Sequence, residues 1–329
     1  MTKLRAASIG LGWWGGVLAD AAARSKDVEV VSCFARSADT REAFATQHGC
    51  RAAASLDEIL ADEEIEALII ATPHGTHLDL VRAAAEAGKH VLLEKPIALS
   101  VADGDACVRA AEGAGITLLI GHHRRRSAAN RALKRIVESG DLGTIHHAAA
   151  EMYVPKYQDP STTAEWRMTR EESPAGAMTG LGVHMIDTMQ HLLGPIARVS
   201  AMSKRILARS PLDDMTSVVM EFASGPLGTL NTSLVLPRRC DLSLHGHEQS
   251  AWSLEDGTRL LRQTKADPAP HEEDIDRIDE LVEQLDELAA CARGDRQPET
   301  NGPAAVSVVA VLAAIVESIE AARPVDVER

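Results

Sequence analysis

Two short motifs in this sequence place titratable side chains where they could move a proton. The first, Glu94-Lys95-Pro96, follows a short apolar run. A lysine that is partly withdrawn from water releases its proton more readily and can hydrogen-bond a substrate hydroxyl. Glu94 would hold the lysine in place, and Pro96 would fix the turn. Because a lysine after a strand is usually an exposed surface residue, Lys95 gains its weight from these two neighbours.

The second motif runs from Gly182 to Asp187 and leads into an apolar segment that ends at Leu193. His184 and Asp187 are three residues apart, so on a helix they share one face. A histidine that a carboxylate orients is the usual arrangement for general acid/base catalysis. We therefore predict that His184 exchanges a proton and that Asp187 orients it, although a histidine in such a place is more often structural.

A glycine-rich turn over residues 10–15 indicates what these groups would act beside. The apolar residues 4–9 before it predict a buried strand, and residues 17–23 after it predict a helix. A glycine turn between a strand and a helix is typical of dinucleotide binding, and the alternative is a purely structural turn.

Each glycine of the turn has a predicted role. Gly10 would allow the tight turn, Gly12 would let the backbone approach a pyrophosphate, and Gly15 would let the helix pack closely on the strand. The helix N-terminus would offer free N–H groups to the phosphates. Trp13 and Trp14 lie within the turn and are predicted to contact the cofactor with it.

The end of the next predicted strand, residues 28–34, bears on which nicotinamide cofactor binds. A carboxylate there normally binds the ribose hydroxyls of NAD(H), whereas an arginine accommodates the 2′-phosphate of NADP(H). Arg36, Ser37 and Arg41 stand near the strand end, and guanidinium groups bind phosphate through charge-assisted contacts. We therefore predict NADP(H) as the preferred cofactor. Binding of NAD(H) is the alternative, in which Arg36 is solvated and Asp39 serves the ribose.

Thr72, Pro73 and His77 follow another short apolar run. Ligands of open α/β sheets bind at the carboxyl ends of the strands, so these residues are predicted to bind the cofactor together with Glu94 and Lys95. The nicotinamide ring would then lie over Pro73 and Glu94, beside the lysine.

Strand and helix patterns alternate through the first 120 residues, and the strands are continuously apolar. Such strands are buried on both faces, which predicts a parallel, doubly wound α/β sheet. After about residue 122 the strands are longer, alternate partly and have few helices between them, which predicts an α+β domain with a large, mainly antiparallel open sheet. We therefore expect one domain at 1–122 and a second at 123–329.

Composition excludes several classes of partner. The formal net charge of -14 argues against nucleic acid and against an anionic membrane surface. Residues 304–316 predict a buried helix too short to span a bilayer, and residues 272–291 predict an acidic amphipathic helix. The five cysteines are scattered without a C-x-x-C pair, which argues against a disulfide framework, and we expect no metal. With its first strand almost at Met1, the protein is expected to be cytoplasmic.

As a set, the motifs resemble the glucose–fructose oxidoreductase / inositol dehydrogenase / rhizopine-catabolism (Gfo/Idh/MocA) family over essentially the full length. The matching pieces are the glycine turn, Thr72-Pro73 with His77, Glu94-Lys95-Pro96, Gly121 with Arg125, Trp166-Arg167, and Gly182 to Asp187. The resemblance implies a Rossmann domain, then a domain for substrate binding whose open sheet usually mediates homodimers or homotetramers. It also implies hydride transfer between nicotinamide and a secondary alcohol or ketone, with Lys95 and His184 on either side of the reacting hydroxyl.

One position departs from the family pattern. Several sugar and inositol dehydrogenases of the family carry an aspartate four residues before the catalytic histidine, where this chain has Gly180. His184 then needs another orienting partner, and Asp187 is the nearest candidate in sequence. The departure weakens inositol and glucose as substrates without arguing for a loss of activity.

Arginines gather near the expected substrate site, three in succession at 124–126 and one beside a tryptophan. Arg125, Trp166, Arg167 and His184 are predicted to bind the substrate, since arginine suits a planar carboxylate. In the alternative interpretation most of these arginines are solvated, and one packs against the cofactor or a carboxylate of its own chain.

The sequence thus predicts an NADP(H)-preferring dehydrogenase or reductase that acts on a small molecule, at a CH–OH/ketone pair of a sugar, polyol or cyclic alcohol. Three alternatives stay open. They are a dehydrogenase of a carboxylated cyclic dihydrodiol, a lyase or glycosidase that keeps its cofactor bound without net redox change, and a non-catalytic dinucleotide sensor. Loss of the lysine and the histidine would mark the sensor, and this chain retains Lys95 and His184.

Overall fold

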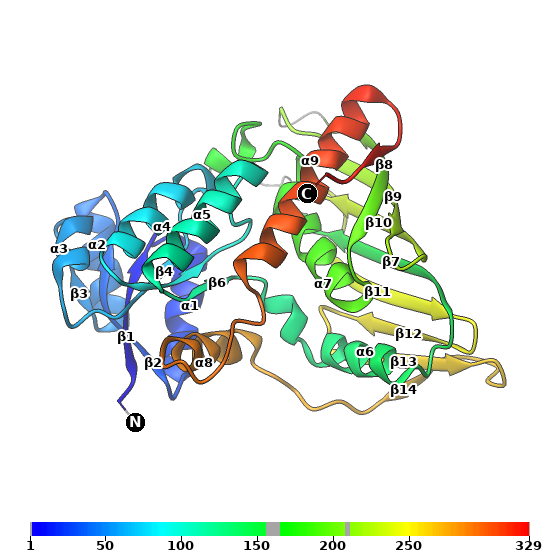
Figure 1. Ribbon diagram of the computed structural model, residues 1–329, viewed down its shortest axis with the longest axis horizontal. Coiled ribbons are helices and arrows are strands. Elements are labelled where there is room, and N and C mark those ends of the chain that lie inside the picture. The colour runs from blue at the N-terminus through cyan, green and yellow to red at the C-terminus, as the bar shows by residue number, and fades with distance from the viewer. Residues whose placement is uncertain (1, 156–164, 208–210, 329) are drawn as a thin grey trace. The chain divides into compact units, whose positions relative to one another are not determined.

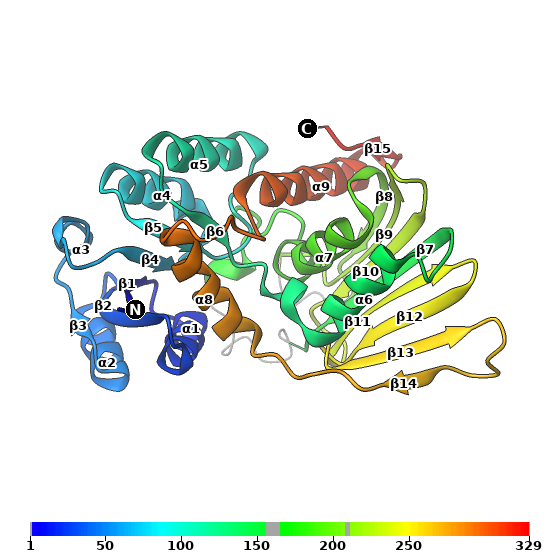
Figure 2. The ribbon, with the colours of Figure 1, turned by 60° about the horizontal axis from the view of Figure 1, so that its bottom comes forward.

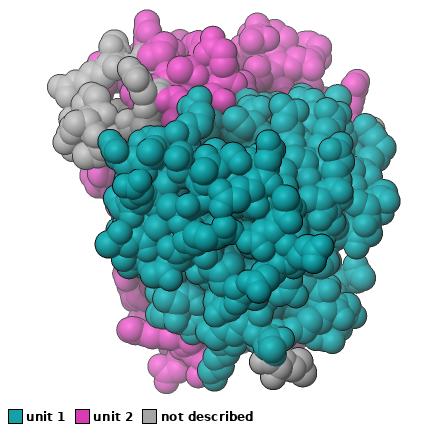
Figure 3. Space-filling view, turned by 90° about the vertical axis from the view of Figure 1, so that its left-hand side faces the viewer, with its two compact units in different colours: residues 1–123, 279–306 teal, residues 124–278, 307–329 magenta. Residues whose placement is uncertain are grey.

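The computed structural model describes residues 2–155, 165–207 and 211–328, and the chain divides into two compact units (Figure 3). The first comprises Met1–His123 and Asp279–Val306, and the second comprises Arg124–Ile278 and Ser307–Arg329. The first unit therefore includes a segment from the far end of the chain. A single division at residue 122 did not anticipate this return.

A six-stranded parallel sheet forms the centre of the first unit (Figure 1). Its strand order, β3-β2-β1-β4-β5-β6, is that of the doubly wound dinucleotide-binding fold, which confirms the prediction. The strands are β1 (Leu4–Ile9), β2 (Val28–Phe34), β3 (Arg51–Ala52), β4 (Ala67–Ile70), β5 (His90–Leu93) and β6 (Leu118–Ile120). The helices are α1 (Trp13–Arg24), α2 (Ala38–His48), α3 (Leu56–Ala61), α4 (His77–Glu86), α5 (Val101–Ala114) and α8 (Glu280–Ala292).

Local sequence signals set the ends of these elements. Every position of β4 is buried, as expected for a strand covered on both faces. Ser37, Ser55 and Ser100 begin α2, α3 and α5, each accepting a hydrogen bond from a backbone N–H three residues further on. Gly49 and Gly115 end α2 and α5 in the left-handed conformation. These caps fix where the chain turns back to the sheet.

The second unit is built on a nine-stranded sheet with the order β14-β13-β12-β11-β7-β10-β9-β8-β15, in which only β7 and β10 pair in parallel. The strands are β7 (Ile145–Tyr153), β8 (Ile196–Lys204), β9 (Met215–Phe222), β10 (Leu227–Ser233), β11 (Arg239–Gly246), β12 (Gln249–Leu254), β13 (Arg259–Thr264), β14 (His271–Glu273) and β15 (Val325–Asp326). The mainly antiparallel sheet that the sequence predicts is confirmed.

Helices cover one face of this sheet. α6 (Ala128–Ser139), α7 (Val183–Leu193) and the later part of α9 (Gly302–Ala321) pack on it and share its apolar core (Figure 2). Burial alternates along β9, where Val218 and Met220 are buried whereas Ser217, Val219 and Glu221 are exposed. The outer face of β9 is therefore open, as expected for an antiparallel sheet with one solvated side.

The acidic helix predicted over 272–291 is shorter than expected. α8 begins only at Glu280, because Asp279 caps its N-terminus by accepting a hydrogen bond from the backbone N–H of Val282. The first two residues of the predicted helix, Glu272 and Glu273, instead belong to the edge strand β14, which pairs with β13. The helix predicted from the spacing of apolar residues is therefore correct only after its N-cap, Asp279.

The apolar helix predicted over 304–316 is longer than expected. α9 has 20 residues and is by length and composition alone long and apolar enough to cross a membrane. However, 56% of its most apolar window is buried inside the protein, and the core helix of a soluble protein passes the same test. Val308, Val311 and Ile315 belong to the core of the second unit, which confirms the predicted buried position.

Candidate functional site

The loops that follow β1, β4, β5 and β6 stand side by side at the carboxyl edge of the parallel sheet. The residue directly after each strand, Gly10, Ala71, Glu94 or Gly121, donates its backbone N–H to the last residue of the neighbouring strand, at N–O distances between 2.8 and 3.2 Å. Sheet pairing thus continues one residue past the strands and aligns these four residues in a row. Ligands of open α/β sheets bind along this edge.

The glycine turn has the tight backbone that the sequence predicts. Gly10 has a φ of 90°, and a Cβ there would lie 2.6 Å from the carbonyl oxygen of Ala71, so only glycine fits. A Cβ on Gly15 would collide with the carbonyl oxygen of Gly10, which confirms the close packing of helix on strand.

Gly12 differs from the other two glycines because the space around it is open. It is the N-cap of α1, no side chain among the described residues caps the helix there, and a Cβ would meet no atom within 4 Å. The first turn of α1 therefore presents N–H groups without a side-chain cap. This arrangement fits a pyrophosphate.

The two tryptophans of the turn differ in exposure. Trp13 is 77% exposed, whereas Trp14 packs on the apolar core of the first unit, with its ring centre 5.4 Å from that of His123. Trp14 therefore supports the fold as well, and cofactor contact stays a prediction for both residues.

At the end of β2, one arginine holds the loop and another is open to a ligand. The guanidinium of Arg41 donates to the carbonyl oxygens of Ala35 and Arg36 at 2.8 and 3.1 Å and lies over the Phe34 ring. The hydroxyl of Ser37 caps α2. The side chain of Arg36 is exposed, and no hydrogen bond or ion pair joins it to another described residue. Of Arg36, Ser37 and Arg41, Arg36 is therefore the residue whose side chain can bind an anion without breaking a hydrogen bond to another described residue.

The carboxylate of Glu94 is buried against Gly121. Only 6% of Glu94 is exposed, and a Cβ on Gly121 would lie 2.6 Å from its Oε1 atom. The same carboxylate accepts the backbone N–H of Lys95 at 3.3 Å, and the half-buried lysine precedes a cis peptide bond to Pro96. Glu94 thus holds the backbone of the lysine, as predicted. In the sequence, Gly121 was matched to the family but was not predicted to make room for the Glu94 carboxylate. The only sign of this role was its position directly after a strand.

His77 is fully buried at the start of α4. Its Nδ1 atom lies 3.0 Å from the carbonyl oxygen of Pro96, and its Nε2 atom lies 3.3 Å from that of Thr72. The ring therefore ties the loop after β4, which includes Pro73, to the loop after β5. Its contact with the cofactor stays a prediction, beside this positioning role.

In the second unit, a short π-helix, Met178–Gly182, runs directly into α7 and places His184 in the first turn of that helix. His184 is 6% exposed. Gly182 has no room for a side chain because Met178 packs against it, whereas a Cβ on Gly180 would meet no atom within 4 Å. The position of the missing family aspartate therefore has space beside it. π-helical turns recur at functional sites.

Asp187 is bound by Arg125. The guanidinium donates from Nε to Oδ2 at 2.7 Å and from Nη2 to Oδ1 at 2.5 Å, and the two side chains are only 7% and 1% exposed. Arg125 thus binds a carboxylate of its own chain, the alternative interpretation of this arginine. It stays a prediction that Asp187 orients His184 and that Arg125 binds the substrate. Both roles have to be compatible with the ion pair between Arg125 and Asp187.

The neighbouring arginines are also largely buried, which corrects the expectation that most of them are solvated. Arg124 lies 3.0 Å from the carboxylate of Asp256, which Arg238 also binds. Burial acts to raise the pKa of the Asp256 carboxyl, but the two guanidinium groups outweigh it and hold that pKa below its usual value. Arg126 is fully buried. Side chains of the second unit therefore pair with both Arg124 and Arg125.

Trp166 and Arg167 lie in a short 3₁₀ helix, Glu165–Met168, and contact each other. The central carbon of the Arg167 guanidinium is 4.2 Å from the centre of the Trp166 ring. A cation of the same chain thus covers one face of the indole. Substrate contact stays a prediction for both residues.

Histidine pairs of the second unit bind other protein groups. His245 lies 3.0 Å from the hydroxyls of both Ser243 and Ser250, and its ring stacks on that of His147. Within the described ranges, no three histidine, cysteine, aspartate or glutamate side chains gather as a possible metal site.

Comparison with protein families identifies both halves of the chain. Residues 4–122 match the model of an oxidoreductase family with an NAD-binding Rossmann fold. Residues 130–252 match the GFO/IDH/MocA C-terminal domain.

Similar proteins of known name differ in their chemistry. The 1,5-anhydro-D-fructose reductase of Ensifer adhaerens is 30% identical over 233 residues, which are 70% of this chain and 69% of the relative. The 2,7-anhydro-N-acetylneuraminate hydratase of Escherichia coli K12 is 29% identical over 227 residues, 68% of this chain but 59% of the relative. Among solved structures, an oxidoreductase of Desulfitobacterium hafniense, provisionally described as NADPH-dependent, is 28% identical. It superposes with a TM-score of 0.94 over 99% of this chain and 98% of its own.

Proposed function

The chain belongs to the Gfo/Idh/MocA family of oxidoreductases, and on that premise we propose that it is an NADP(H)-preferring dehydrogenase or reductase. Its substrate is a secondary alcohol or ketone in a sugar, a polyol or another cyclic alcohol. The observation that carries the proposal is the row of Gly10, Ala71, Glu94 and Gly121 along the carboxyl edge of the parallel sheet, with Lys95 directly beside it.

Each group of this edge has a distinct task. The N–H groups in the first turn of α1 bind the pyrophosphate, and Glu94 fixes the backbone of Lys95. When bound, the cofactor supplies the hydride acceptor or donor at C4 of its nicotinamide. The ammonium of Lys95 hydrogen-bonds the reacting oxygen and polarises it, and His184 exchanges a proton with that oxygen. Asp187, which also binds Arg125, orients His184, and the hydroxyl of Thr188 donates to the carbonyl oxygen of His184 in the same helix.

Arg36 supports the preference for NADP(H). It is an exposed cation at the end of β2, and a guanidinium suits a phosphate dianion. The provisional NADPH dependence of the Desulfitobacterium neighbour agrees with this assignment. Asp39, exposed in the first turn of α2, is the residue that would bind a ribose if NAD(H) were preferred.

Fluorescence titration with NADPH and NADH tests the cofactor assignment on wild type, Arg36→Ala and Arg82→Ala. Arg82 is an exposed arginine on α4 of the same unit and serves as the control. We expect tighter binding of NADPH than of NADH, with the preference lost only in Arg36→Ala. A preference that survives Arg36→Ala would overturn the role of this residue, and equal affinities in wild type would overturn the NADP(H) preference. If wild type binds neither nucleotide, the proposed dehydrogenase function is overturned.

A screen of sugars, polyols and carboxylated cyclic diols then tests the substrate class. Turnover is measured by the change in nicotinamide absorbance. Lys95→Met serves as the inactive control. Turnover of a carboxylated diol alone would replace the main proposal with the dihydrodiol alternative. For that alternative, Arg125 would bind the carboxylate through its remaining donors, because two of its donors already bind Asp187.

A second candidate is favoured by the similarity to the hydratase of E. coli. In this function the cofactor stays bound, the substrate is transiently oxidised, and a later reduction of the product restores the cofactor. Nucleotide that remains on the purified protein, together with substrate consumption without a net change of nicotinamide absorbance, would support it. A steady accumulation of reduced or oxidised nicotinamide would exclude it.

For the assembly, we propose a homodimer or homotetramer that forms through the open face of the nine-stranded sheet. Met202, Val219 and Leu227 are exposed on the neighbouring strands β8, β9 and β10 and give this face an apolar part. Sedimentation equilibrium of wild type and Val219→Lys tests the proposal, since a charge there should shift the population towards monomer. A monomeric wild type would overturn it.

A further inference from the structure

Three consecutive residues in the turn between β12 and β13 have a left-handed backbone. Glu255, Asp256 and Gly257 have φ angles of 52°, 61° and 82°. Aspartate and glycine tolerate this conformation in hairpin turns, whereas a glutamate there is strained. Among the other described residues, Ala322 is the only non-glycine residue with a positive φ. Strained residues persist only where surrounding contacts enforce them, and they cluster at functional sites.

Gly257 caps a helix that belongs to another part of the chain. Its carbonyl oxygen accepts a hydrogen bond at 3.0 Å from the backbone N–H of Ala129, in the first turn of α6. Ser127, the N-cap of that helix, makes no capping hydrogen bond with its side chain. A Cβ on Gly257 would lie 2.2 Å from the hydroxyl oxygen of Ser127 and 2.5 Å from its Cβ atom. The turn thus satisfies an N–H group at the start of α6, and it approaches the helix as closely as only a glycine can.

Asp256 binds Arg124, which lies in the short 3₁₀ helix His123–Arg126 before α6. The carboxylate and the guanidinium are 3.0 Å apart. The same carboxylate accepts hydrogen bonds from Nε and Nη2 of Arg238 at 3.0 and 2.9 Å. The carbonyl oxygen of Arg124 accepts a hydrogen bond from the side-chain amide of Asn130 at 2.8 Å. Contacts therefore hold Arg124 at its backbone and at its side chain.

Arg125, the next residue of the 3₁₀ helix, carries the buried ion pair with α7. Its guanidinium binds both carboxylate oxygens of Asp187, and Asp187 lies three residues after His184 on that helix. A bidentate pair requires the planar guanidinium and the carboxylate to face each other, so it tolerates little displacement of either backbone. The position of the 3₁₀ helix therefore decides whether Arg125 reaches Asp187 with both donors.

We propose that Asp256 is a positioning residue for the proposed reaction. Through Arg124 it fixes the 3₁₀ helix, and thereby the pair of Arg125 and Asp187 on the helix from which His184 exchanges its proton. Asp256 acts through these residues and is not itself catalytic. The effect on turnover rests on the proposed function, whereas the structural link from Asp256 to α7 does not.

Replacement of the carboxylate by an amide shows how the link would fail. Asp256→Asn keeps the size of the side chain but removes the negative charge that the guanidinium groups of Arg124 and Arg238 share. Without this charge the two cations repel each other, and Arg124 is displaced. We therefore expect the 3₁₀ helix and the start of α7 to loosen while the rest of the second unit stays folded.

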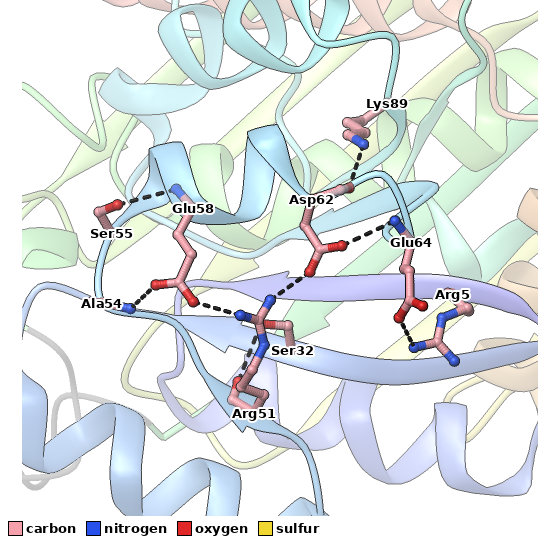
Figure 4. A network of polar contacts seen from close by, with 9 residues as sticks. All are labelled: Arg5, Ser32, Arg51, Ala54, Ser55, Glu58, Asp62, Glu64 and Lys89. Atoms are coloured by element: carbon pink, nitrogen blue, oxygen red, sulfur yellow. Dashed lines mark hydrogen bonds and ion pairs between the residues drawn. The ribbon is translucent and has the colours of Figure 1, made fainter.

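Asp62 of the first unit offers a matched control. Figure 4 shows its carboxylate beside the guanidinium of Arg51, which donates to it at 2.6 Å and also binds Glu58. The side chains of Asp62 and Asp256 are 27% and 30% exposed. Asp62→Asn therefore removes the same charge from an ion pair of the same kind and exposure, in a unit that does not contain α6 or α7.

Amide hydrogen exchange measured by mass spectrometry tests the structural link without a substrate. In Asp256→Asn we expect faster exchange than in wild type in peptides that cover residues 124–130 and 183–190. Asp62→Asn should exchange like wild type in these peptides. Arg238→Met should do so too, because it leaves Arg124 bound to Asp256. Asp256→Asn would overturn the link if its exchange were unchanged in these peptides, or if it rose equally over the whole second unit.

Turnover then tests the positioning role, with the compound that reacts fastest among the sugars, polyols and carboxylated cyclic diols. We expect the kcat of Asp256→Asn to fall about tenfold, because misplaced catalytic groups slow the chemical step. Its KM for the nicotinamide cofactor and its unfolding temperature should match those of Asp62→Asn. A kcat equal to that of Asp62→Asn would overturn the positioning role. A wild type that turns over none of these compounds would instead refute the proposed function, and hydrogen exchange would still decide the link.

Discussion

The arginines of the two units differ in what balances their charge. The side chain of Arg36, at the carboxyl edge of the parallel sheet, is exposed and forms no hydrogen bond or ion pair with another described residue. Arg125, in the second unit, is buried in a bidentate pair with Asp187. From the sequence, both were predicted to bind an anionic ligand. The comparison teaches that burial and partner distances distinguish an arginine that the folded chain already binds from one that remains available to a ligand.

The largest effect is expected when the buried pair is broken. Arg125→Met removes the bidentate partner of Asp187, and removal of one member of a buried ion pair costs about 3–5 kcal/mol. The free energy of unfolding in urea should fall by this amount, whereas Arg36→Met should change it by less than about 0.5 kcal/mol. Similar losses in both variants would erase the distinction between the two arginines.

A smaller loss in the free energy of unfolding is expected from a substitution in the glycine turn. A glycine of the first unit and one of the second are compared here, as the two arginines were. Gly10→Ala forces a side chain into a left-handed residue 2.6 Å from the Ala71 carbonyl oxygen, at a cost of about 1–3 kcal/mol. Gly180→Ala, in the second unit, enters open space and should change the free energy of unfolding by less than about 1 kcal/mol. Thermal unfolding with and without NADPH measures both, and stabilisation by NADPH should be lost only in Gly10→Ala. A Gly10→Ala variant as stable as wild type would contradict the strained turn.

The smallest effect is expected at the partly exposed pair of Arg124 and Asp256. Because the folded carboxyl has a lowered pKa, its contribution is present above the unfolded value of about 3.9 and is lost as the pH falls through the lower folded value. Asp256→Asn should therefore cost less than about 1 kcal/mol at pH 7 and nothing in strong acid. Urea titrations at both pH values measure this. A cost that persists in acid would show that packing rather than charge is lost.

The main features of the fold followed from the sequence because they depend on local patterns. Continuous apolar strands predicted the parallel sheet, and partial alternation predicted the open one. α6 was missed although Ala129, Leu133 and Ile136 stand at helical spacing, because the three arginines at 124–126 just before it drew the interpretation towards a ligand site. β3 has two residues, too few for any periodicity.

The features of the candidate site likewise differ in whether they depend on local sequence or on tertiary packing. The constraints on Gly10 and Gly15 arise from contacts within one turn, so a short motif predicts them. The pair of Arg125 and Asp187 depends on how separate elements meet. No spacing rule announces such contacts, because tertiary packing alone brings these residues together.

The short strands at the sheet edges also affect how the protein behaves when it is concentrated. β3 and β6 close the six-stranded sheet with two and three residues, and β14 and β15 close the nine-stranded sheet with three and two. Edges this short present few unpaired backbone groups to another chain. Aggregation by strand addition, the route to amyloid-like fibrils, therefore has little template in the folded protein.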